Sequence, residues 1–396
     1  MYYRFTAKSF RKREWCENMY DWKKRGRKML SYSVFLPSYS VGEDCYQQIP
    51  YVTRKYGKTA VVIGGKTAME KARQELDAAV QGSDVQILDY IWYGGDSNYE
   101  NVEMLKADSR VQEADMLFGV GGGRACDTVK TLADMLDKPF FTFPTLASNC
   151  AACTAITVMY NPDGSFKEYY YMHAPSYHTF VNTKIIADSP EKLLWAGIGD
   201  ALSKECEVLF ASRDKFIYHT PLMGQCISKV CTTPLVEYGA KALEACRNNK
   251  PDFALEQVAL DIIISTGIVS NFATHENQPD PKDNYYYNSS LAHCVYYGAS
   301  TLPQCERHLH GEIVSFGVLC LLTYDGQLEE RDRIMQFNKS VGLPVTLDEL
   351  EISREDLVKI ADKAASVVEW TYVPGIPTKE RFIQAMIDTD EAGKRL

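Results

Sequence analysis

Short apolar segments alternate with helix-forming segments through the first half of the chain. The expected strands are residues 59–63, 85–90, 116–120 and 140–143, and the expected helices between them are residues 67–79, 99–109 and 124–135. Strand and helix in alternation form right-handed crossovers, which make the sheet parallel and place helices on both of its faces. The pattern therefore predicts an N-terminal α/β domain with a parallel sheet.

The pattern changes after residue 185, where helices replace the alternation. A hairpin is expected over residues 154–171, with its turn at Asn161-Pro162-Asp163-Gly164. Helices are then expected over residues 193–212, 221–247, 252–272, 311–325, 329–340 and 354–367. Residues 275–290 contain two prolines and a tyrosine cluster, so we expect a loop there that acts as a lid. The chain is thus divided into a basic extension (1–30), an α/β domain (31–185) and an all-helical domain (186–396).

Charge and composition exclude several classes of protein. The 396 residues are 45% hydrophobic and 24% charged, which is ordinary for a soluble globular protein of this length. Residues 1–30 are basic, but the net charge of the chain is -9, so its body is acidic and we expect no nucleic-acid partner. A secretory signal and a run of about 18 apolar residues are both missing from the sequence, so no membrane association is expected. The twelve scattered cysteines suit a reducing compartment, and cytoplasm is the expected location.

A glycine run at residues 119–123 stands where a strand should turn into a helix. Glycines at such a turn let the backbone approach a phosphate closely, and the free N–H groups of the following helix favour an anion. The run departs from the dinucleotide fingerprint because its sixth position is Arg124. The weaker G-G-K-T at 64–67 lacks the first glycine of a P-loop, since Ala60 stands there. The run fits either a turn that binds a nucleotide phosphate or a turn with a purely structural role.

Three residues far apart in the chain are candidate ligands of a metal ion, namely Asp200, His293 and His310. One carboxylate and two imidazoles suit a divalent ion, and three protein ligands leave a position open for water or substrate, as in catalytic sites. Taken singly, a histidine is more often a packed or surface residue, and that interpretation is kept for His173, His178, His219, His275 and His308.

Five motifs in order give the chain a resemblance to a known family. They are G-G-G-R-A-C-D-T-V-K (121–130), P-T-L-A-S (144–148), A-G-I-G-D-A-L (196–202), A-H-C-V-Y-Y-G (292–298) and H-G-E-I-V-S-F-G (310–317). From about Ser31 onward the chain resembles the iron-containing alcohol dehydrogenase superfamily, in its glycerol dehydrogenase and hydroxycarboxylate dehydrogenase-like branch. The resemblance implies a dehydroquinate synthase-like fold, in which a Rossmann-like nucleotide-binding domain faces a helical metal-binding domain across a cleft.

The resemblance also implies roles for individual residues. It places one divalent metal, and catalysis through it, on Asp200, His293 and His310. It places NAD or NADP on Lys66, Gly122, Gly123, Asp127, Thr145, Ser148, Thr154, Ile156 and Tyr160. The substrate is expected beside Asn149, Cys150 and Tyr297.

Departures from the family pattern refine these expectations. Iron-dependent relatives carry a histidine four residues after the ligand aspartate, whereas this chain has Lys204, so zinc is favoured over iron on ligand count. Tyr297 replaces a histidine of the relatives, which puts a proton-relay role of that position in doubt. NAD-using relatives carry an aspartate where this chain has Gly65 followed by Lys66, so nothing there repels a 2'-phosphate and NADP is admitted.

The most consequential departure is Cys150. Glycerol dehydrogenases have an aspartate at this position that accepts hydrogen bonds from polyol hydroxyls, and a thiol cannot replace it in that role. Without that negative charge an anionic substrate is tolerated, and S-N-C-A-A-C-T (148–154) is similar to the segment in hydroxycarboxylate dehydrogenases that reduce 2-oxo acids.

We therefore expect a metal-dependent oxidoreductase that transfers hydride between NAD(P)(H) and a 2-hydroxy acid/2-oxo acid pair. A glycerol dehydrogenase is the first alternative, and a dehydroquinate synthase-like lyase is the second. A non-catalytic binding protein is disfavoured because all three ligand positions are filled. The expected partner is a small-molecule substrate, and the expected assembly is a homo-oligomer.

Overall fold

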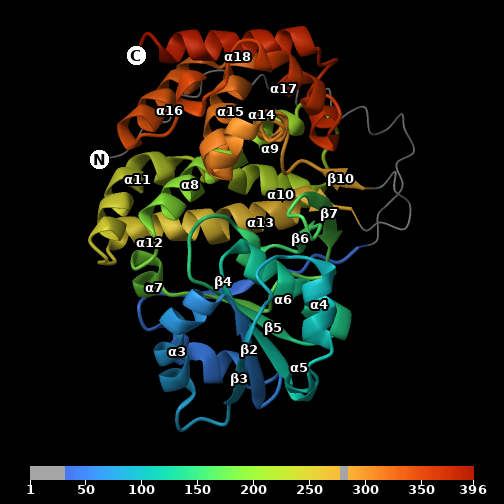
Figure 1. Ribbon diagram of the computed structural model, residues 1–396, viewed down its shortest axis with the longest axis vertical. Coiled ribbons are helices and arrows are strands. Elements are labelled where there is room, and N and C mark those ends of the chain that lie inside the picture. Colours follow the sequence, from blue (N-terminus) through green and yellow to red (C-terminus); the bar gives the residue numbers. More distant parts are fainter. Residues whose placement is uncertain (1–31, 277–283) are drawn as a thin grey trace.

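The computed structural model describes residues 32–276 and 284–396. Figure 1 shows an α/β part, coloured blue to green, beneath a helical part coloured light green to red. The α/β part is built on one parallel six-stranded sheet with the order β1-β8-β5-β4-β2-β3. Its strands are β1 (Ser38–Val41), β2 (Thr59–Gly64), β3 (Gln86–Trp92), β4 (Met116–Gly121), β5 (Phe140–Pro144) and β8 (His178–Val181). The predicted parallel sheet is confirmed.

Helices cover both faces of this sheet, as the alternation predicts. Successive residues of β2 point to opposite faces, so Val62 packs in one apolar cluster while Ile63 packs in another. The first cluster includes residues of α3, and the second includes residues of α4 and α6. The covering helices are α2 (Ile49–Thr53), α3 (Lys66–Val80), α4 (Tyr99–Lys106), α5 (Ser109–Glu113) and α6 (Gly123–Leu136).

The predicted hairpin is present beside the sheet. Strands β6 (Ile156–Tyr160) and β7 (Phe166–Tyr171) pair antiparallel. Gly164 adopts φ +83° in the turn, a conformation that L side chains rarely adopt. The hairpin lies between the sheet and the helical part (Figure 1), so its strands can contribute side chains to the junction of the two.

Apart from one short two-stranded sheet, the rest of the described chain is helical. Its helices are α7 (Thr183–Ala187), α8 (Glu191–Ala201), α9 (Ser203–Ala211), α10 (His219–Ser228), α11 (Thr233–Arg247), α12 (Phe253–Leu260), α13 (Thr266–Ala273), α14 (Leu291–Ala299), α15 (His310–Tyr324), α16 (Leu328–Val341), α17 (Asp356–Ala364) and α18 (Lys379–Gly393). A π-helical turn, Asp261–Ser265, joins α12 to α13, and short 3-10 helices are η2 (Cys45–Gln48), η3 (Ala151–Cys153), η6 (Pro303–Arg307), η7 (Asp348–Leu350) and η8 (Val368–Tyr372). The predicted domain boundary at residue 185 falls within α7.

Some predicted elements differ from the structure. The single helix expected over residues 221–247 is wrong, because the chain leaves the helix at 229–232 and forms α10 and α11. The loop expected at 275–290 contains strand β10 (Tyr285–Tyr286), which pairs with β9 (Thr274–His275). Residues 277–283 of the proposed lid and the basic extension 1–30 lie outside the described residues.

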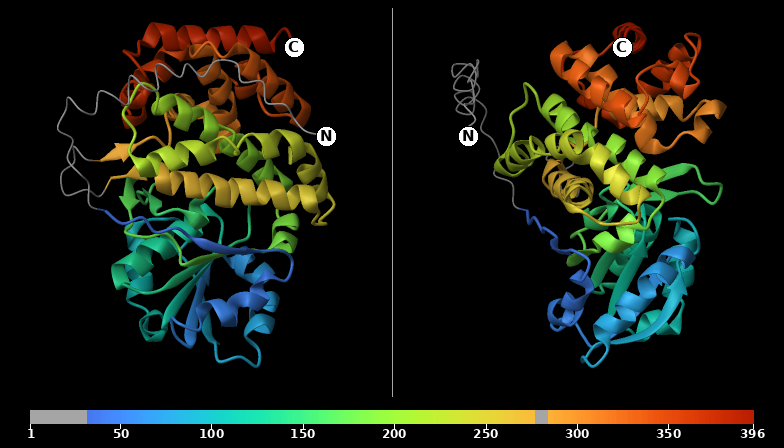
Figure 2. Two further views of the ribbon diagram at one scale, coloured as in Figure 1. Left: turned by 180° about the vertical axis from the view of Figure 1, so that it is seen from behind. Right: turned by 90° about the vertical axis from the view of Figure 1, so that its left-hand side faces the viewer.

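The run Phe253–Ala273 is long and apolar enough to cross a membrane by length and composition. However, 67% of its most apolar window is buried inside the fold. Figure 2 shows it from behind, lying across the helical part directly above the sheet. Its apolar character thus fits a core helix of the helical domain.

Candidate active site

Asp200, His293 and His310 converge on one point of the structure. One ligand atom from each lies within 4.8 Å of the other two. Asp200 Oδ1 is 3.0 Å from His310 Nε2 and 3.8 Å from His293 Nε2. The three residues come from α8, α14 and α15, and α15 packs against both of the other helices. A small inward shift would let one divalent ion replace the direct His310–Asp200 contact, so the donor set fits a metal.

Glycines in two of the three ligand motifs allow these helices to approach closely. A Cβ on Gly311 would lie 1.8 Å from the carbonyl oxygen of Ala196, and one on Gly199 would lie 2.4 Å from that of Gly311. Likewise, a Cβ on Gly317 would lie 2.4 Å from the carbonyl oxygen of Ala292. Any larger residue would push α15 away from α8 or from α14, and the three ligands would separate. The motifs therefore carry the packing of the site as well as its ligands.

Glu207 orients His293 and was missed by the sequence analysis. Its Oε2 lies 2.7 Å from His293 Nδ1, while its Oε1 accepts the backbone N–H groups of Ser290 and His293 at 2.8 and 3.0 Å. This fully buried carboxylate draws the proton of the imidazole to Nδ1 and leaves Nε2 as the lone-pair donor toward Asp200. Glu207 is seven residues beyond Asp200, which is two helical turns along. This spacing is the only signal in the sequence that relates Glu207 to the metal-ligand candidates.

The charges of this cluster stabilise one another. Burial alone would raise the pKa of Asp200, but His310 and His293 together with Lys204 hold that pKa below its ordinary value. Burial likewise opposes ionisation of Glu207, and His293 keeps the pKa of this carboxyl low. Burial would lower the pKa of His293, and the carboxylates of Glu207 and Asp200 raise it. Both carboxylates are therefore anionic near neutral pH and available to a cation.

Lys204 occupies the position where iron-dependent relatives carry a further histidine. It lies one helical turn after Asp200, because Leu202 between α8 and α9 keeps a right-handed helical conformation. Only 7% of Lys204 is exposed, and its Nζ donates to Asn288 Oδ1 at 2.5 Å. An ammonium in place of an imidazole leaves three protein ligands for the metal.

The glycine run forms the second half of the site, at the junction of β4 and α6. Gly121 adopts φ +149°, and α6 begins at Gly123 with Gly122 as its N-cap. A Cβ on Gly122 would lie 2.8 Å from Leu146 Cδ1, and one on Gly123 would lie 2.8 Å from Asn149 Nδ2. The turn therefore keeps its N–H groups accessible to an anion, which fits a cofactor phosphate.

One cavity of about 730 Å³ is lined by residues of both halves. It contains all three metal-ligand candidates and most of the other predicted site residues: Gly122, Gly123, Asp127, Ser148, Asn149, Cys150, Thr154, Ile156, Tyr160 and Tyr297. Two predicted cofactor residues are not among its lining residues. Thr145 is 5% exposed, and its backbone N–H donates to the carbonyl of Gly121 at 3.2 Å. Lys66 lies with its Nζ 4.7 Å from the ring centre of Trp92.

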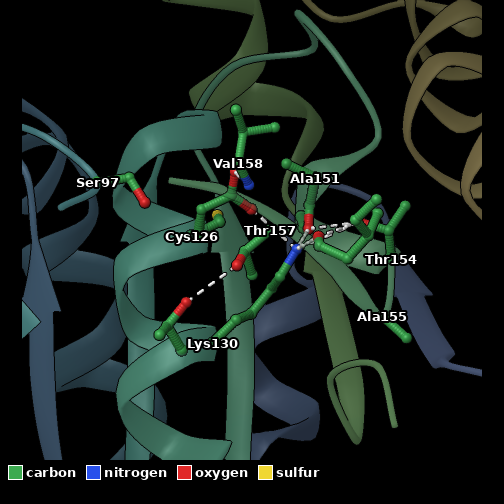
Figure 3. A network of polar contacts seen from close by, with 12 residues as sticks. Ser97, Cys126, Lys130, Ala151, Thr154, Ala155, Thr157 and Val158 are labelled. Atoms are coloured by element: carbon green, nitrogen blue, oxygen red, sulfur yellow. Dashed lines mark hydrogen bonds and ion pairs between the residues drawn. The ribbon is translucent and has the colours of Figure 1, made fainter. Parts of the chain in front are cut away.

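Asp127 lines the cavity and also forms a buried ion pair with Lys130, whose Nζ lies 2.9 Å from Asp127 Oδ1. Lys130 Nζ further donates to the carbonyls of Ala151 and Ile156 at 2.6 and 2.7 Å (Figure 3). Asp127 Oδ2 accepts the backbone N–H of Val158 at 3.1 Å. This pair ties α6 to the segment that carries Cys150 and to β6, a role that the sequence analysis did not assign to Lys130.

Tyr297 belongs to a buried polar chain. Its hydroxyl forms a short hydrogen bond with that of Tyr169, which donates to Glu369 Oε1 at 3.4 Å. Burial raises the pKa of Glu369 above its ordinary value. Tyr296, next in sequence, packs against the His310 ring with 4.1 Å between ring centres. These aromatic residues form the wall of the cavity beside the metal-ligand candidates.

Known proteins are similar to this chain in sequence and in fold. Residues 37–181 match the family described as iron-containing alcohol dehydrogenase. Hydroxycarboxylate dehydrogenase A of Escherichia coli K12 is 30% identical over 76% of this chain and 80% of its own length. Glycerol dehydrogenase of Escherichia coli O6:H1 is 27% identical over 90% and 96%. The crystal structure of glycerol dehydrogenase from Schizosaccharomyces pombe, 21% identical, covers 93% of each chain with a TM-score of 0.80.

These likenesses confirm the predicted fold and the predicted resemblance. They also support the oxidoreductase expectation over the lyase alternative, because the matched family consists of alcohol dehydrogenases. The family implies NAD(H) and a divalent metal as cofactors. The chain belongs to the iron-containing alcohol dehydrogenase family and is an oxidoreductase of the alcohol dehydrogenase type.

Proposed function

We propose that this enzyme reduces a 2-oxo acid to the 2-hydroxy acid, using zinc and NADPH or NADH. The observation that carries the proposal is the convergence of Asp200, His293 and His310 in the same cavity as the glycine run. Cys150, in that cavity, supplies no carboxylate to bind polyol hydroxyls or to repel an anion. The relationship to hydroxycarboxylate dehydrogenase A supports the same substrate class.

The two halves of the cavity have separate tasks. When bound, a divalent ion would polarise the substrate carbonyl as a Lewis acid and the nicotinamide would supply the hydride, with a proton from water completing the hydroxyl group. Asp200, His293 and His310 would hold the ion, and Glu207 keeps His293 in the productive tautomer. The glycine turn would hold the cofactor phosphates, while Thr154, Ile156 and Tyr160 lie where the ring can be oriented against the substrate. The protein therefore acts mainly by positioning.

Zinc and NADP are the finer parts of the cofactor proposal. Lys204 at the position of a fourth ligand supports zinc, because three ligands with one open position are its usual catalytic arrangement. Gly65 at the end of β2 supports NADP, since it offers no carboxylate against a 2'-phosphate. We also propose a homo-oligomer in the cytoplasm, a compartment that fits the eleven described cysteines, all of which are free. Light scattering of the purified protein measures its assembly.

A substrate panel with a matched variant tests the proposed reaction. Wild type and Cys150→Asp are assayed, with zinc or ferrous iron and with NAD(H) or NADP(H), on 2-oxo acids, 2-hydroxy acids, diols and glycerol. We expect wild type to favour 2-oxo acid reduction and Cys150→Asp to shift the preference toward glycerol, with Cys150→Ser resembling wild type. Glycerol as the best wild-type substrate would establish the second candidate, a polyol dehydrogenase, which the relationship to glycerol dehydrogenases favours.

The metal site is tested separately with His293→Ala. The variant should lose bound metal and turnover together, while nucleotide binding, measured by fluorescence titration, survives. Full activity of a metal-free His293→Ala protein would refute the metal mechanism.

A further inference from the structure

Lys204 places a buried positive charge in the wall of the cavity. It lines the same space as Asp200, His293 and His310, although it is not a metal ligand. With 7% of the residue exposed, its ammonium has lost most of its hydration. Burying an ammonium is costly unless an anion or a full set of hydrogen-bond acceptors compensates it.

Its protein partners provide only part of that compensation. Lys204 Nζ donates to Asn288 Oδ1 at 2.5 Å and lies 3.5 Å from the Asn288 carbonyl oxygen. Both acceptors are neutral and belong to one residue. Among residues 32–276 and 284–396, no carboxylate forms an ion pair with Lys204 within 4.0 Å. An ammonium has three N–H donors, so one remains for a ligand in the cavity.

The other cation of the cavity wall is already paired. Arg124 lies 3.1 Å from Asp96 Oδ1, and its guanidinium stacks on the ring of Tyr160 at 4.7 Å. It therefore belongs to the cofactor side. Within the described chain, Lys204 is the cation near the metal-ligand candidates that lacks an anionic partner.

The charges around the loaded metal site leave room for one anion. At the loaded site, the divalent ion and the Lys204 ammonium carry three positive charges against the two carboxylates of Asp200 and Glu207, so these four groups leave one positive charge over. A neutral polyol would leave this positive charge uncompensated, whereas a monocarboxylate would neutralise it.

We propose that the Lys204 ammonium, held in place by Asn288, binds the carboxylate of a 2-oxo acid. The keto oxygen of this substrate then points toward the metal position between Asp200, His293 and His310. Lys204 is then the residue that selects anionic over neutral carbonyl substrates. This inference rests on the proposed function and names the group that recognises the substrate.

The test compares a matched substrate pair, pyruvate and hydroxyacetone, which differ by a carboxylate in place of a hydroxymethyl group. Lys204→Met should lower the ratio of kcat/KM for pyruvate to that for hydroxyacetone by about 10- to 100-fold, the range expected for one hydrogen-bonded charge pair. Lys204→Gln, which keeps a hydrogen bond to Asn288 but removes the charge, should lower this ratio to a similar extent. Lys204→Arg should retain more of the preference for pyruvate. Lys192→Met, on the exposed side of α8, is the control and should leave the ratio unchanged.

A binding measurement without turnover accompanies the kinetics. Oxamate, an unreactive analogue of a 2-oxo acid, is titrated calorimetrically into the zinc- and NAD-loaded proteins, whose metal content is measured beforehand. Its affinity should fall in parallel with the kinetic ratio. A Lys204→Met protein that retains zinc, the wild-type ratio and the wild-type oxamate affinity overturns the role of Lys204 alone. A wild-type enzyme that neither reduces pyruvate nor binds oxamate overturns the proposed function together with it.

Discussion

At the scale of single residues, Glu207 governs the metal site without contacting the metal position. In Glu207→Gln the amide oxygen must still accept the backbone N–H groups of Ser290 and His293, so the amide NH₂ faces His293 Nδ1. That contact favours the tautomer with the proton on Nε2, which cannot ligate. We expect metal affinity to fall about 10- to 100-fold, measured by chelator competition. Glu205→Gln, on the same helix, is the control; equal affinities for both variants would contradict the role of Glu207.

A second residue-scale prediction concerns Gly65. Its φ is -70°, and an added Cβ would meet nothing closer than Ala68 Cβ at 3.7 Å, so Gly65→Asp is sterically tolerated. The new carboxylate would accept from the ribose 2'-hydroxyl of NAD and repel the 2'-phosphate of NADP. We expect the NADP:NAD ratio of kcat/KM to fall by at least about 10-fold. Gly65→Asn controls for side-chain volume, and an unchanged ratio would place the 2'-position elsewhere.

The sequence identifies the residues of the site only as far as motifs reach. Asp200, His293 and His310 are recognisable because each stands in a motif with the glycines that pack its helix. Glu207 stands in no motif, and its role depends on the distance between α9 and α14, which no local pattern encodes. Lys204 is visible as a departure, but its burial against Asn288 is a property of the folded chain.

At the scale of elements, Lys130 holds the segment after β5 onto α6 (Figure 3). Lys130→Met would leave Asp127 buried without its cation and the carbonyls of Ala151 and Ile156 without their donor. Breaking a buried pair in this way costs about 3–5 kcal/mol of unfolding free energy, measured by urea denaturation. Lys71→Met removes the half-exposed pair with Asp188 and should cost much less, because surface ion pairs stabilise weakly. Similar losses in both variants would contradict the assignment.

The edge strand β1 is joined to β8 through His178. Ser38 Oγ donates to the carbonyl of Tyr177, so it accepts from His178 Nδ1–H, and Nε2 then accepts from Ser40 Oγ. Burial lowers the pKa of His178 to about 4, which makes the neutral ring the folded form. The unfolded chain, with a pKa of about 6.5, binds the proton more tightly. Stability is therefore complete above about pH 6.5 and is lost as the pH falls toward 4.

The size of this effect is as much as about 3 kcal/mol of unfolding free energy. The check is urea denaturation at pH 7.5 and pH 5. His178→Asn, which keeps hydrogen-bonding groups but does not titrate, should lose less stability between the two pH values than wild type does. The exposed His219→Asn is the control and should follow wild type. A wild-type loss no greater than that of His178→Asn would contradict the burial argument.

Elements with a strong local pattern were predictable and others were not. Strands β2, β4 and β5 are apolar runs followed by glycine or proline, and the predicted bounds agree with the structure to within a residue or so. Strands β1 and β8 are four residues each, which is too short for a periodic pattern to distinguish them from loop. Helix α14 was not predicted either, because its nine residues are mostly apolar on all sides.

At the scale of the whole molecule, the site is assembled from two parts whose apolar clusters differ for the most part. The metal-ligand candidates come from helices of one large apolar cluster, whereas the glycine turn joins a strand and a helix of the sheet domain. The cavity is the place where the two surfaces meet. Turnover should therefore need both parts of the molecule, whereas zinc should bind to the helical part and the nucleotide to the sheet part.

Hydrogen exchange measures this division directly. A ligand that binds only the folded form at 100 times its Kd stabilises it by about 2.7 kcal/mol, which slows the exchange of amides that open locally in its own site by about 100-fold. Zinc should slow exchange in α8, α14 and the start of α15, and NADPH should slow it at the β4–α6 junction and after β5. Removing zinc with a chelator should reverse only the first effect and abolish turnover. If zinc instead protects the glycine turn, or NADPH protects α14, the two sites are coupled across the sheet–helix junction, where Cys126 of α6 and Ala147 after β5 belong to the same apolar cluster as the ligand helices.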